Sequence, residues 1–427
     1  MDSFQLSLFL AVPFFLVLMI IELVATKLAK RNYYDNKNDV ISSLSSGIAT
    51  AVIRTTGFGF AIISYDFMLA HLKVFNFVDI TSPWAWFWGF IALDFGSYWG
   101  HRWKHKYNFL WQFHLVHHSS EEYNLPVALR QNSLGGINLL SFLLFPAAIL
   151  GIPTDMLAIL SIAFLYAQYW YHTRFFGELG ILEYILVTPS QHRVHHAVNK
   201  EYIDKNFSAI FCIWDRLFGT FQRELPDQET IFGVKHPVKT LNPIKIDLMY
   251  WWDMVKTSVR TKQGRDKINV WLKTTGWRPE DIDKEYQKGN IQDIKKYQKY
   301  RPVISHAAGI WGIIEFIVMF IIAIGIVVQI PHLSFTLHVA GVTFVLFQIV
   351  TITNALEGKR NLLLPTLRLL IAGGLILYQG GAWFGIENYL PQISLFIMAY
   401  FSVGVVTAWT FYQTPMTNND AEIDKVK

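Results

Sequence analysis

The chain has 427 residues, of which 52% are hydrophobic and only 16% charged, against roughly 25% charged in soluble domains, so we expect a membrane protein. Its single cysteine, Cys212, excludes an internal disulfide and a Cys-x-x-Cys metal site. The net charge of +5 fits basic loops facing anionic lipid, and no basic helix with interleaved aromatic residues indicates nucleic-acid binding.

Apolar runs form two groups separated by a polar stretch, 172–302. The first run lacks the basic start of a secretory signal and is too long for its apolar core, which predicts a retained transmembrane helix. Two runs beside Gly151-Ile152-Pro153 are short, and predict either a tight spanning pair or a re-entrant hairpin. The runs are 4–26, 41–64, 84–100, 137–152 and 155–171, then 303–329, 334–353, 361–379 and 390–412.

Basic residues after the first run predict the orientation. Lys27, Lys30, Arg31 and Lys37 place that loop in the cytoplasm by the positive-inside rule. The N-terminus is then outside, and the polar stretch and the C-terminus are cytoplasmic.

Charged residues also interrupt the apolar runs. These are Arg54, Glu315 and Arg368, and intramembrane charges usually pair or line a cavity. They indicate either a lipid or cofactor pocket or a structural pair.

Nine of the 14 histidines lie between residues 101 and 196, mostly at helical spacing. Residues at i, i+3 and i+4 share a helix face, so each cluster can direct several imidazoles at one point. Neutral imidazole is a ligand for Fe, Zn, Cu and Ni. Nine imidazoles are too many for one ion and predict two metals side by side. They are His101 and His105, then His114, His117 and His118, then His172, and finally His192, His195 and His196.

Six polar residues near the clusters are candidates for supporting a ligand or contacting substrate. Asp94 shares a helix face with His101 and is expected either to hold an imidazole in its tautomer or to pair with a basic residue. Arg130 is expected to bind a lipid phosphate or to lie at the membrane interface. Asp204, Asn206 and Asp215 could accept from imidazole N–H groups or cap turns, and Asn124 is a polar residue just before an apolar run. The six are Asp94, Asn124, Arg130, Asp204, Asn206 and Asp215.

The histidine boxes resemble those of the fatty acid hydroxylase / sterol desaturase superfamily of membrane di-iron oxygenases, over about residues 85–225. The family boxes match 101–105, 114–118 and 192–196, with His172 in the place of an extra single ligand. Within the superfamily the chain is most similar to the branch that cleaves ether lipids. It departs at Lys106, where animal members carry Glu, and at Gln191, where a His often precedes the last box.

The resemblance implies a fold, a centre and an activity. The fold is an all-α membrane protein, a multi-span helical bundle with a cytoplasmic helical cap that holds the di-metal site. All nine histidines become ligands of a di-iron (Fe2+) centre that uses O2 and a membrane lipid. Electrons come from tetrahydrobiopterin or from an external electron-transfer partner. The membrane is a bacterial inner membrane or the endoplasmic reticulum.

The implied reaction is hydroxylation of a lipid C–H bond, including O-alkyl cleavage of ether glycerolipids. The alternatives are a fatty acyl or sterol-type hydroxylase or desaturase and, from another class, a Zn-binding membrane transporter. A lipid hydrolase is disfavoured, because the sequence lacks HExxH and GxSxG.

The expected organisation has five parts. They are N-terminal transmembrane helices in 1–83, a fatty acid hydroxylase-like di-iron domain in 84–225, a charged cytoplasmic segment in 226–302, a four-helix transmembrane subdomain in 303–413 and a polar tail in 414–427.

Overall fold

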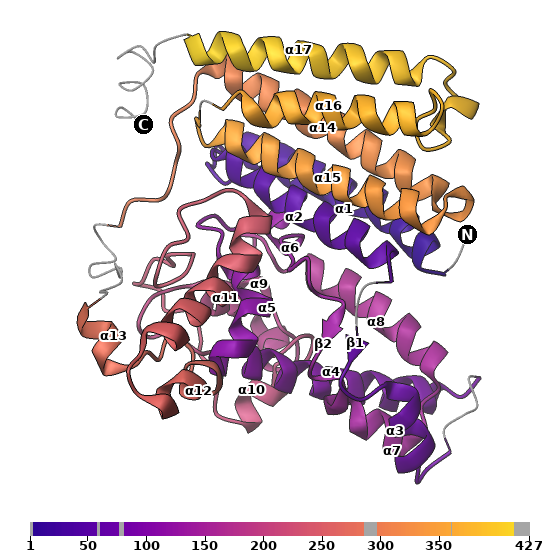
Figure 1. Cartoon of the computed structure of the whole chain (residues 1–427). Coiled ribbons are helices and arrows are strands. Elements are labelled where there is room, and N and C mark those ends of the chain that lie inside the picture. Colours follow the sequence, from indigo (N-terminus) through magenta and orange to yellow (C-terminus); the bar gives the residue numbers. More distant parts are fainter. Residues whose placement is uncertain (1–2, 58–59, 77–80, 286–296, 360, 414–427) are drawn as a thin grey trace. The chain divides into compact units, whose positions relative to one another are not determined.

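The computed structural model describes residues 3–57, 60–76, 81–285, 297–359 and 361–413. The expected polar tail, 414–427, lies outside the described residues. Within them the chain is predominantly helical (Figure 1), which confirms the all-α prediction. The described strands are β1 (Phe60–Ala61) and β2 (Ile137–Asn138), which pair in parallel with Phe60 opposite Ile137.

The chain separates into two compact units. The first comprises residues 1–36, 59–238 and 247–298, and the second comprises 37–58, 239–246 and 299–427. The N-terminal block expected in 1–83 is therefore divided, because residues 37–58 join the C-terminal helices and the rest joins the histidine-bearing unit.

The first unit holds every clustered histidine. Its helices are α1 (Ser3–Leu28), α3 (Tyr65–Leu72), α4 (Pro83–Lys106), α5 (Asn108–His118), α6 (Leu125–Ala128), α7 (Phe145–Leu150), α8 (Thr154–Tyr169), α9 (Pro189–His196), α10 (Ile213–Leu217), α12 (Gly264–Leu272) and α13 (Glu280–Glu285), with 3-10 turns η1 (Ser141–Leu144) and η2 (Gly180–Tyr184). Helix α11 (Pro243–Arg260) begins in the second unit and continues into the first.

The apolar run 137–152 forms β2, η1 and α7, and the run 155–171 forms most of α8. Helices α7 and α8 are joined by a tight turn at Gly151. Helix α8 has 16 residues, about 24 Å at 1.5 Å per residue, against roughly 30 Å for a bilayer core. Gly151 has a φ of 76°, and a Cβ there would collide with the Phe75 carbonyl oxygen. These dimensions favour the re-entrant hairpin over the spanning pair.

The second unit is a bundle of apolar helices. They are α2 (Lys37–Thr55), α14 (His306–Gln329), α15 (Phe335–Leu356), α16 (Leu363–Tyr378) and α17 (Ile393–Gln413), with turns η4 (Ile330–His332) and η5 (Ile386–Asn388). Helices α14 to α17 run side by side in Figure 1. Of the described residues, three stretches are long and apolar enough to cross a membrane, namely His306–His332, Phe335–Leu356 and Ile393–Thr410. These make the chain a membrane protein.

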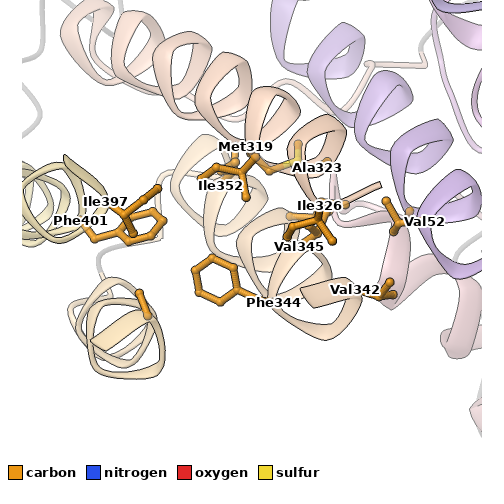
Figure 2. Packing of buried hydrophobic residues seen from close by; sticks show 14 of the residues in the cluster. Val52, Met319, Ala323, Ile326, Val342, Phe344, Val345, Ile352, Ile397 and Phe401 are labelled. Carbon is orange, nitrogen blue, oxygen red and sulfur yellow. The ribbon is translucent and has the colours of Figure 1, made fainter. Parts of the chain in front are cut away.

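The core of this bundle interlocks small and large apolar side chains (Figure 2). Met319 and Ile326 of α14 face Val345 and Ile352 of α15, and Val52 brings α2 into the same core. Helix α2 ends at Thr55, so the apolar run predicted over 41–64 is not one continuous helix.

The intramembrane charges Glu315 and Arg368 form a buried ion pair. Arg368 Nη2 lies 2.7 Å from Glu315 Oε1, and Arg368 Nη1 donates to the second carboxylate oxygen. The guanidinium also lies 4.7 Å from the centre of the Phe401 ring. The structural-pair alternative therefore describes these two residues, whereas Arg54 is exposed in the last turn of α2.

Candidate metal centre

Four segments bring the nine histidines together. His101 and His105 lie on the last turns of α4, and the second box lies on α5, which begins two residues after α4 ends. His172 follows the end of α8. The third box lies on α9, where Pro189 occupies the first turn and the Thr188 side chain accepts from the Gln191 N–H. Each box thus lies on one helix, as its spacing predicts, but the expectation that all the histidines of a box point at one spot is wrong for the second and third boxes.

The imidazoles divide into two groups. The five-histidine group is His101, His105, His114, His118 and His195, and the four-histidine group is His117, His172, His192 and His196. Within each group the candidate ligand nitrogens all lie within 4.8 Å of one another. This grouping fits one metal ion in each and agrees with the count of two metals.

The division cuts through each His-His pair. Consecutive residues on a helix point about 100° apart, whereas i and i+4 share a face. His117 and His118 accordingly belong to different groups, as do His195 and His196. The two groups are also adjacent, since the His118 and His196 rings stack with centroids 4.3 Å apart. Two ions bound here would form one dinuclear centre.

The Nε2 atoms of each group point at one another. The Nε2–Nε2 distances are 2.8 Å for His101–His114, 3.2 Å for His105–His118, 3.1 Å for His118–His195, 3.4 Å for His117–His172, 3.0 Å for His172–His192 and 3.1 Å for His192–His196. Metal–nitrogen bonds of about 2.1 Å meeting at right angles would place two nitrogens roughly 3.0 Å apart. The observed spacing matches that of ligands around a shared cation.

Backbone carbonyls hold the opposite side of four rings. His101 Nδ1 donates to the Phe207 oxygen at 2.8 Å and His195 Nδ1 to the Lys205 oxygen at 2.9 Å. In the same way His117 Nδ1 donates to the Arg130 oxygen at 3.0 Å, and His172 Nδ1 to the Gln168 oxygen at 3.1 Å. A carbonyl can only accept, so Nδ1 carries the proton and the Nε2 lone pair faces inward, ready for a metal.

Burial keeps these imidazoles neutral. Desolvation is the largest cause that lowers the pKa of all nine, and neighbouring charged or imidazole groups lower it further. The pKa of His117 falls to about 4 and that of His195 to about 3. Neutral imidazole is the form that binds metals.

Asp204, Asn206 and Asp215 all act on the segment that carries two of those carbonyls. Asp204 and Asn206 both adopt a positive φ, 57° and 55°, a conformation in which Asn and Asp are enriched. Buried Asp215 accepts from the Phe207 N–H at 2.8 Å and the Ser208 N–H at 2.9 Å. Asp215 therefore supports His101 through Phe207, without touching the ring itself.

Asn206 binds backbone carbonyls, whereas Asp204 faces one of the clustered histidines. Asn206 donates to the Gln191 and Gln222 carbonyls, which ties the segment to α9. Asp204 Oδ1 lies 4.0 Å from His105 Nδ1 with a largely exposed side chain. Asp204 is thus the candidate carboxylate that faces a ligand ring.

The carboxylate of Asp94 is occupied by other donors. It accepts from the Ile210 N–H at 2.9 Å, the Phe211 N–H at 3.1 Å and Trp214 Nε1 at 2.8 Å. From its place on α4, about two turns before His101, Asp94 therefore holds residues 210–214, which follow the third box. The structure gives it this role in place of direct support of an imidazole.

Arg130 and Asn124 are buried rather than open to a phosphate. Arg130 is 1% exposed, and its Nε donates to the Val116 oxygen and Ser119 Oγ at the end of α5. Asn124 Nδ2 donates to the Tyr33 oxygen at 2.8 Å. Arg130 belongs to the support of His117, because its own carbonyl accepts from His117 Nδ1. The expected lipid-phosphate contact does not fit this burial.

Other residues support the site but lie in no spaced motif that would mark them in the sequence, as the histidines do. Arg193 lies between two ligands on α9 and pairs with Glu224 at 2.6 Å while donating to the Thr173 and Phe176 oxygens. Asp247 accepts from Asn132 Nδ2 at 2.7 Å and from the Ser133 N–H at 2.9 Å, which anchors the residues after Arg130. Glu22, an acid inside the apolar run 4–26, is also buried and accepts from the Leu125 N–H and Thr173 Oγ1. Its charge within an apolar run was a signal that could have identified it.

Comparison with known proteins agrees with this geometry. Residues 86–220 match the family model of fatty acid hydroxylase. Alkylglycerol monooxygenase from Homo sapiens is 37% identical over 270 residues, 63% of this chain and 59% of that protein. The Danio rerio protein is 35% identical over 286 residues, 66% of this chain and 62% of that protein.

A relative of lower identity is named for a different function. Ornithine lipid hydroxylase OlsE from Rhizobium tropici is 27% identical over 146 residues, 34% of this chain and 44% of that protein. No solved structure matches the chain significantly.

The matched part of the chain spans less than two thirds of the length of the alkylglycerol monooxygenases. The match to the family model nevertheless includes all nine clustered histidines. Residues 86–220 of this chain therefore resemble a fatty acid hydroxylase domain.

Proposed function

We propose that the chain is a di-iron lipid monooxygenase whose nine histidines hold two Fe2+ ions. The observation that carries the proposal is the division of these imidazoles into adjacent groups of five and four with their Nε2 atoms turned inward. Iron is preferred to zinc because the relatives are named as a monooxygenase and a hydroxylase, and zinc has no redox chemistry.

The nine imidazoles would set the charge and the geometry of the bound metals. When bound, two Fe2+ ions would supply the activation of O2 for insertion of one oxygen atom into a C–H bond. The nine donors are neutral, so they do not offset the charge of the ions, unlike the Glu ligands of soluble di-iron bundles. The backbone carbonyls of Phe207, Lys205, Arg130 and Gln168 orient the rings, so the ligand geometry is set before any substrate binds.

The overall reaction balances with an external reductant. A C–H bond, O2, two electrons and two protons give C–OH and water. If the carbon bears an ether oxygen, the product is a hemiacetal, whose C–O bond breaks to give an aldehyde and a free glycerol hydroxyl. We propose ether glycerolipids as the substrate class, supported by the similarity to two alkylglycerol monooxygenases. The proposed reductant is a tetrahydropterin or an electron-transfer protein, as the resemblance of the histidine boxes implies.

Simple hydroxylation is the second candidate. It is supported by the similarity to ornithine lipid hydroxylase, and would leave an alcohol on an intact acyl lipid. For either reaction we propose a multi-pass protein whose metal centre faces the cytoplasm. The basic residues after α1, Lys27, Lys30, Arg31 and Lys37, support that orientation.

The test uses membranes that contain the full chain, supplied with alkylglycerols, 18O2 and a tetrahydropterin. We expect O2-dependent loss of the alkyl ether with release of a fatty aldehyde that carries 18O. An intact lipid that has gained one oxygen atom would favour simple hydroxylation. Lipids unchanged with every reductant, or zinc at both sites without O2 uptake, would contradict the proposal.

A further inference from the structure

Glu22 is a buried carboxylate on the otherwise apolar helix α1. It is 5% exposed and accepts three hydrogen bonds, from Tyr34 Oη at 2.5 Å, the Leu125 N–H at 2.9 Å and Thr173 Oγ1 at 2.5 Å. Its partners are 12, 103 and 151 residues away in the sequence. Burying a carboxylate costs free energy unless its hydrogen bonds are satisfied, so the three donors make the burial of Glu22 possible.

One of these bonds leads directly to a ligand. Thr173 follows His172, the histidine of the four-histidine group that comes from no helical box. The Thr173 carbonyl also accepts from Arg193 Nη1 at 3.2 Å, which joins it to the residue after His192. Holding Thr173 therefore limits the movement of His172, whose ring is otherwise tethered through Nδ1 to the Gln168 oxygen.

A second bond leads to the same group by another path. The Leu125 N–H lies at the start of α6, two residues after Tyr123. The Tyr123 ring stacks on His172 with centroids 5.8 Å apart and lies 5.4 Å from the His196 ring. The Tyr123 hydroxyl donates to the Tyr171 oxygen at 3.0 Å. Glu22 thus fixes both the backbone beside His172 and the aromatic ring packed against it.

We propose that Glu22 is a positioning residue for the four-histidine metal site. It holds Thr173 and the start of α6 in one arrangement, so that His172 is presented to the metal with His117, His192 and His196. The inference rests on the proposed function only in treating this group as a metal site. The five-histidine group receives its support from Asp215 and the 204–208 segment instead, so loss of Glu22 acts on one site of the two.

The experiment measures Co2+ binding by the purified full chain after removal of metal, without turnover. The wild type is expected to bind two Co2+ ions. In Glu22→Ala, the Co2+ affinity of the four-histidine site should fall by roughly 10- to 100-fold, the range for loss of a ligand-supporting group. The five-histidine site should bind Co2+ as in the wild type. The Co2+ absorption bands that are lost should be those lost in His172→Ala and retained in His101→Ala.

Conservative variants separate positioning from folding. The side-chain amide introduced by E22Q can accept from the Leu125 N–H through its oxygen and donate to the Thr173 hydroxyl through its nitrogen, so E22Q should recover most of the binding. Thr173→Val removes one of the three bonds and should weaken the same site. The control is Glu178→Gln, which breaks an exposed pair with Arg223 in the same unit and should bind both ions normally.

Two results would overturn the inference. One is Glu22→Ala binding both ions with wild-type affinity. The other is equal weakening of both sites in Glu22→Ala while E22Q and Thr173→Val bind normally, which would make Glu22 a folding residue only. A wild-type chain that binds two Co2+ ions but oxidises no lipid would contradict the proposed function and leave the role of Glu22 intact.

Discussion

Replacing Asp215 by Asn changes one atom and should weaken one of the two metal sites. Asp215 Oδ1 accepts from the Phe207 N–H and from Thr220 Oγ1, and Oδ2 accepts from the Ser208 N–H. An Asn side chain has one oxygen and one NH2 group. Whichever way it turns, one of the two backbone N–H groups loses its acceptor and faces another donor.

The size of the effect follows from that mismatch. A buried donor left without an acceptor costs about 1–3 kcal/mol. The cost falls on the peptide units around Phe207, whose carbonyl accepts from His101 Nδ1 at 2.8 Å. If that carbonyl moves, His101 loses the bond that fixes its tautomer, and supporting groups of this kind contribute about 10- to 100-fold in metal affinity. Those factors equal roughly 1.4–2.7 kcal/mol, in agreement with the cost of the lost bond.

The assay is competition for Co2+ between the full chain and a chromophoric chelator. Asp215→Asn should weaken the five-histidine site and leave the four-histidine site unchanged. Asp281→Asn is the matched control, because Asp281 also accepts from a backbone N–H, that of Lys262, and from a hydroxyl, that of Thr261. Wild-type affinity at both sites of Asp215→Asn, or equal weakening of both, would refute the reasoning.

Three further predictions concern stability, each measured by thermal or denaturant unfolding of the purified chain. Arg368→Leu leaves Glu315 buried and unpaired and should cost about 3–5 kcal/mol, most of it recovered when Glu315→Leu is added; equal losses in the single and double variants would contradict this. Gly151→Ala forces a Cβ against the Phe75 oxygen at a φ of 76° and should cost at least about 1–2 kcal/mol, so wild-type stability would count against the hairpin turn. Burial raises the pKa of Asp247 to about 6 from 3.8, so folding takes up a proton there between these pH values. The stability that Asp247 contributes is therefore greatest below pH 3.8 and is lost as the pH rises to about 6. Asp247→Asn should remove that decline. An unchanged pH profile in that variant would contradict the assignment.

The nine candidate ligands could be chosen from the sequence because most of them depend on local helix geometry. The i and i+4 positions of each box share a helix face whatever the rest of the fold does. The single ligand His172 has no such spacing, and it entered the prediction through its position between boxes and through the family resemblance. The supporting residues were less accessible. Asp94 and Arg130 were identified as candidates, but their partners include backbone groups such as the Ile210 N–H and the Val116 oxygen, and no side-chain pattern marks those.

The division of the histidines into two groups could be predicted in part from the sequence. Every i, i+4 pair stays within one group: His101 with His105, His114 with His118, and His192 with His196. Each adjacent pair is divided, because consecutive side chains diverge by about 100° on a helix. The HxxHH spacing therefore already contains the rule that one box serves both metals, with its first and last histidines on one ion and its middle histidine on the other. What the spacing does not contain is which boxes share an ion, because that depends on how α4, α5 and α9 pack. The pairing of His195 with the first box and of His117 with the third is the contribution of the tertiary fold to the centre.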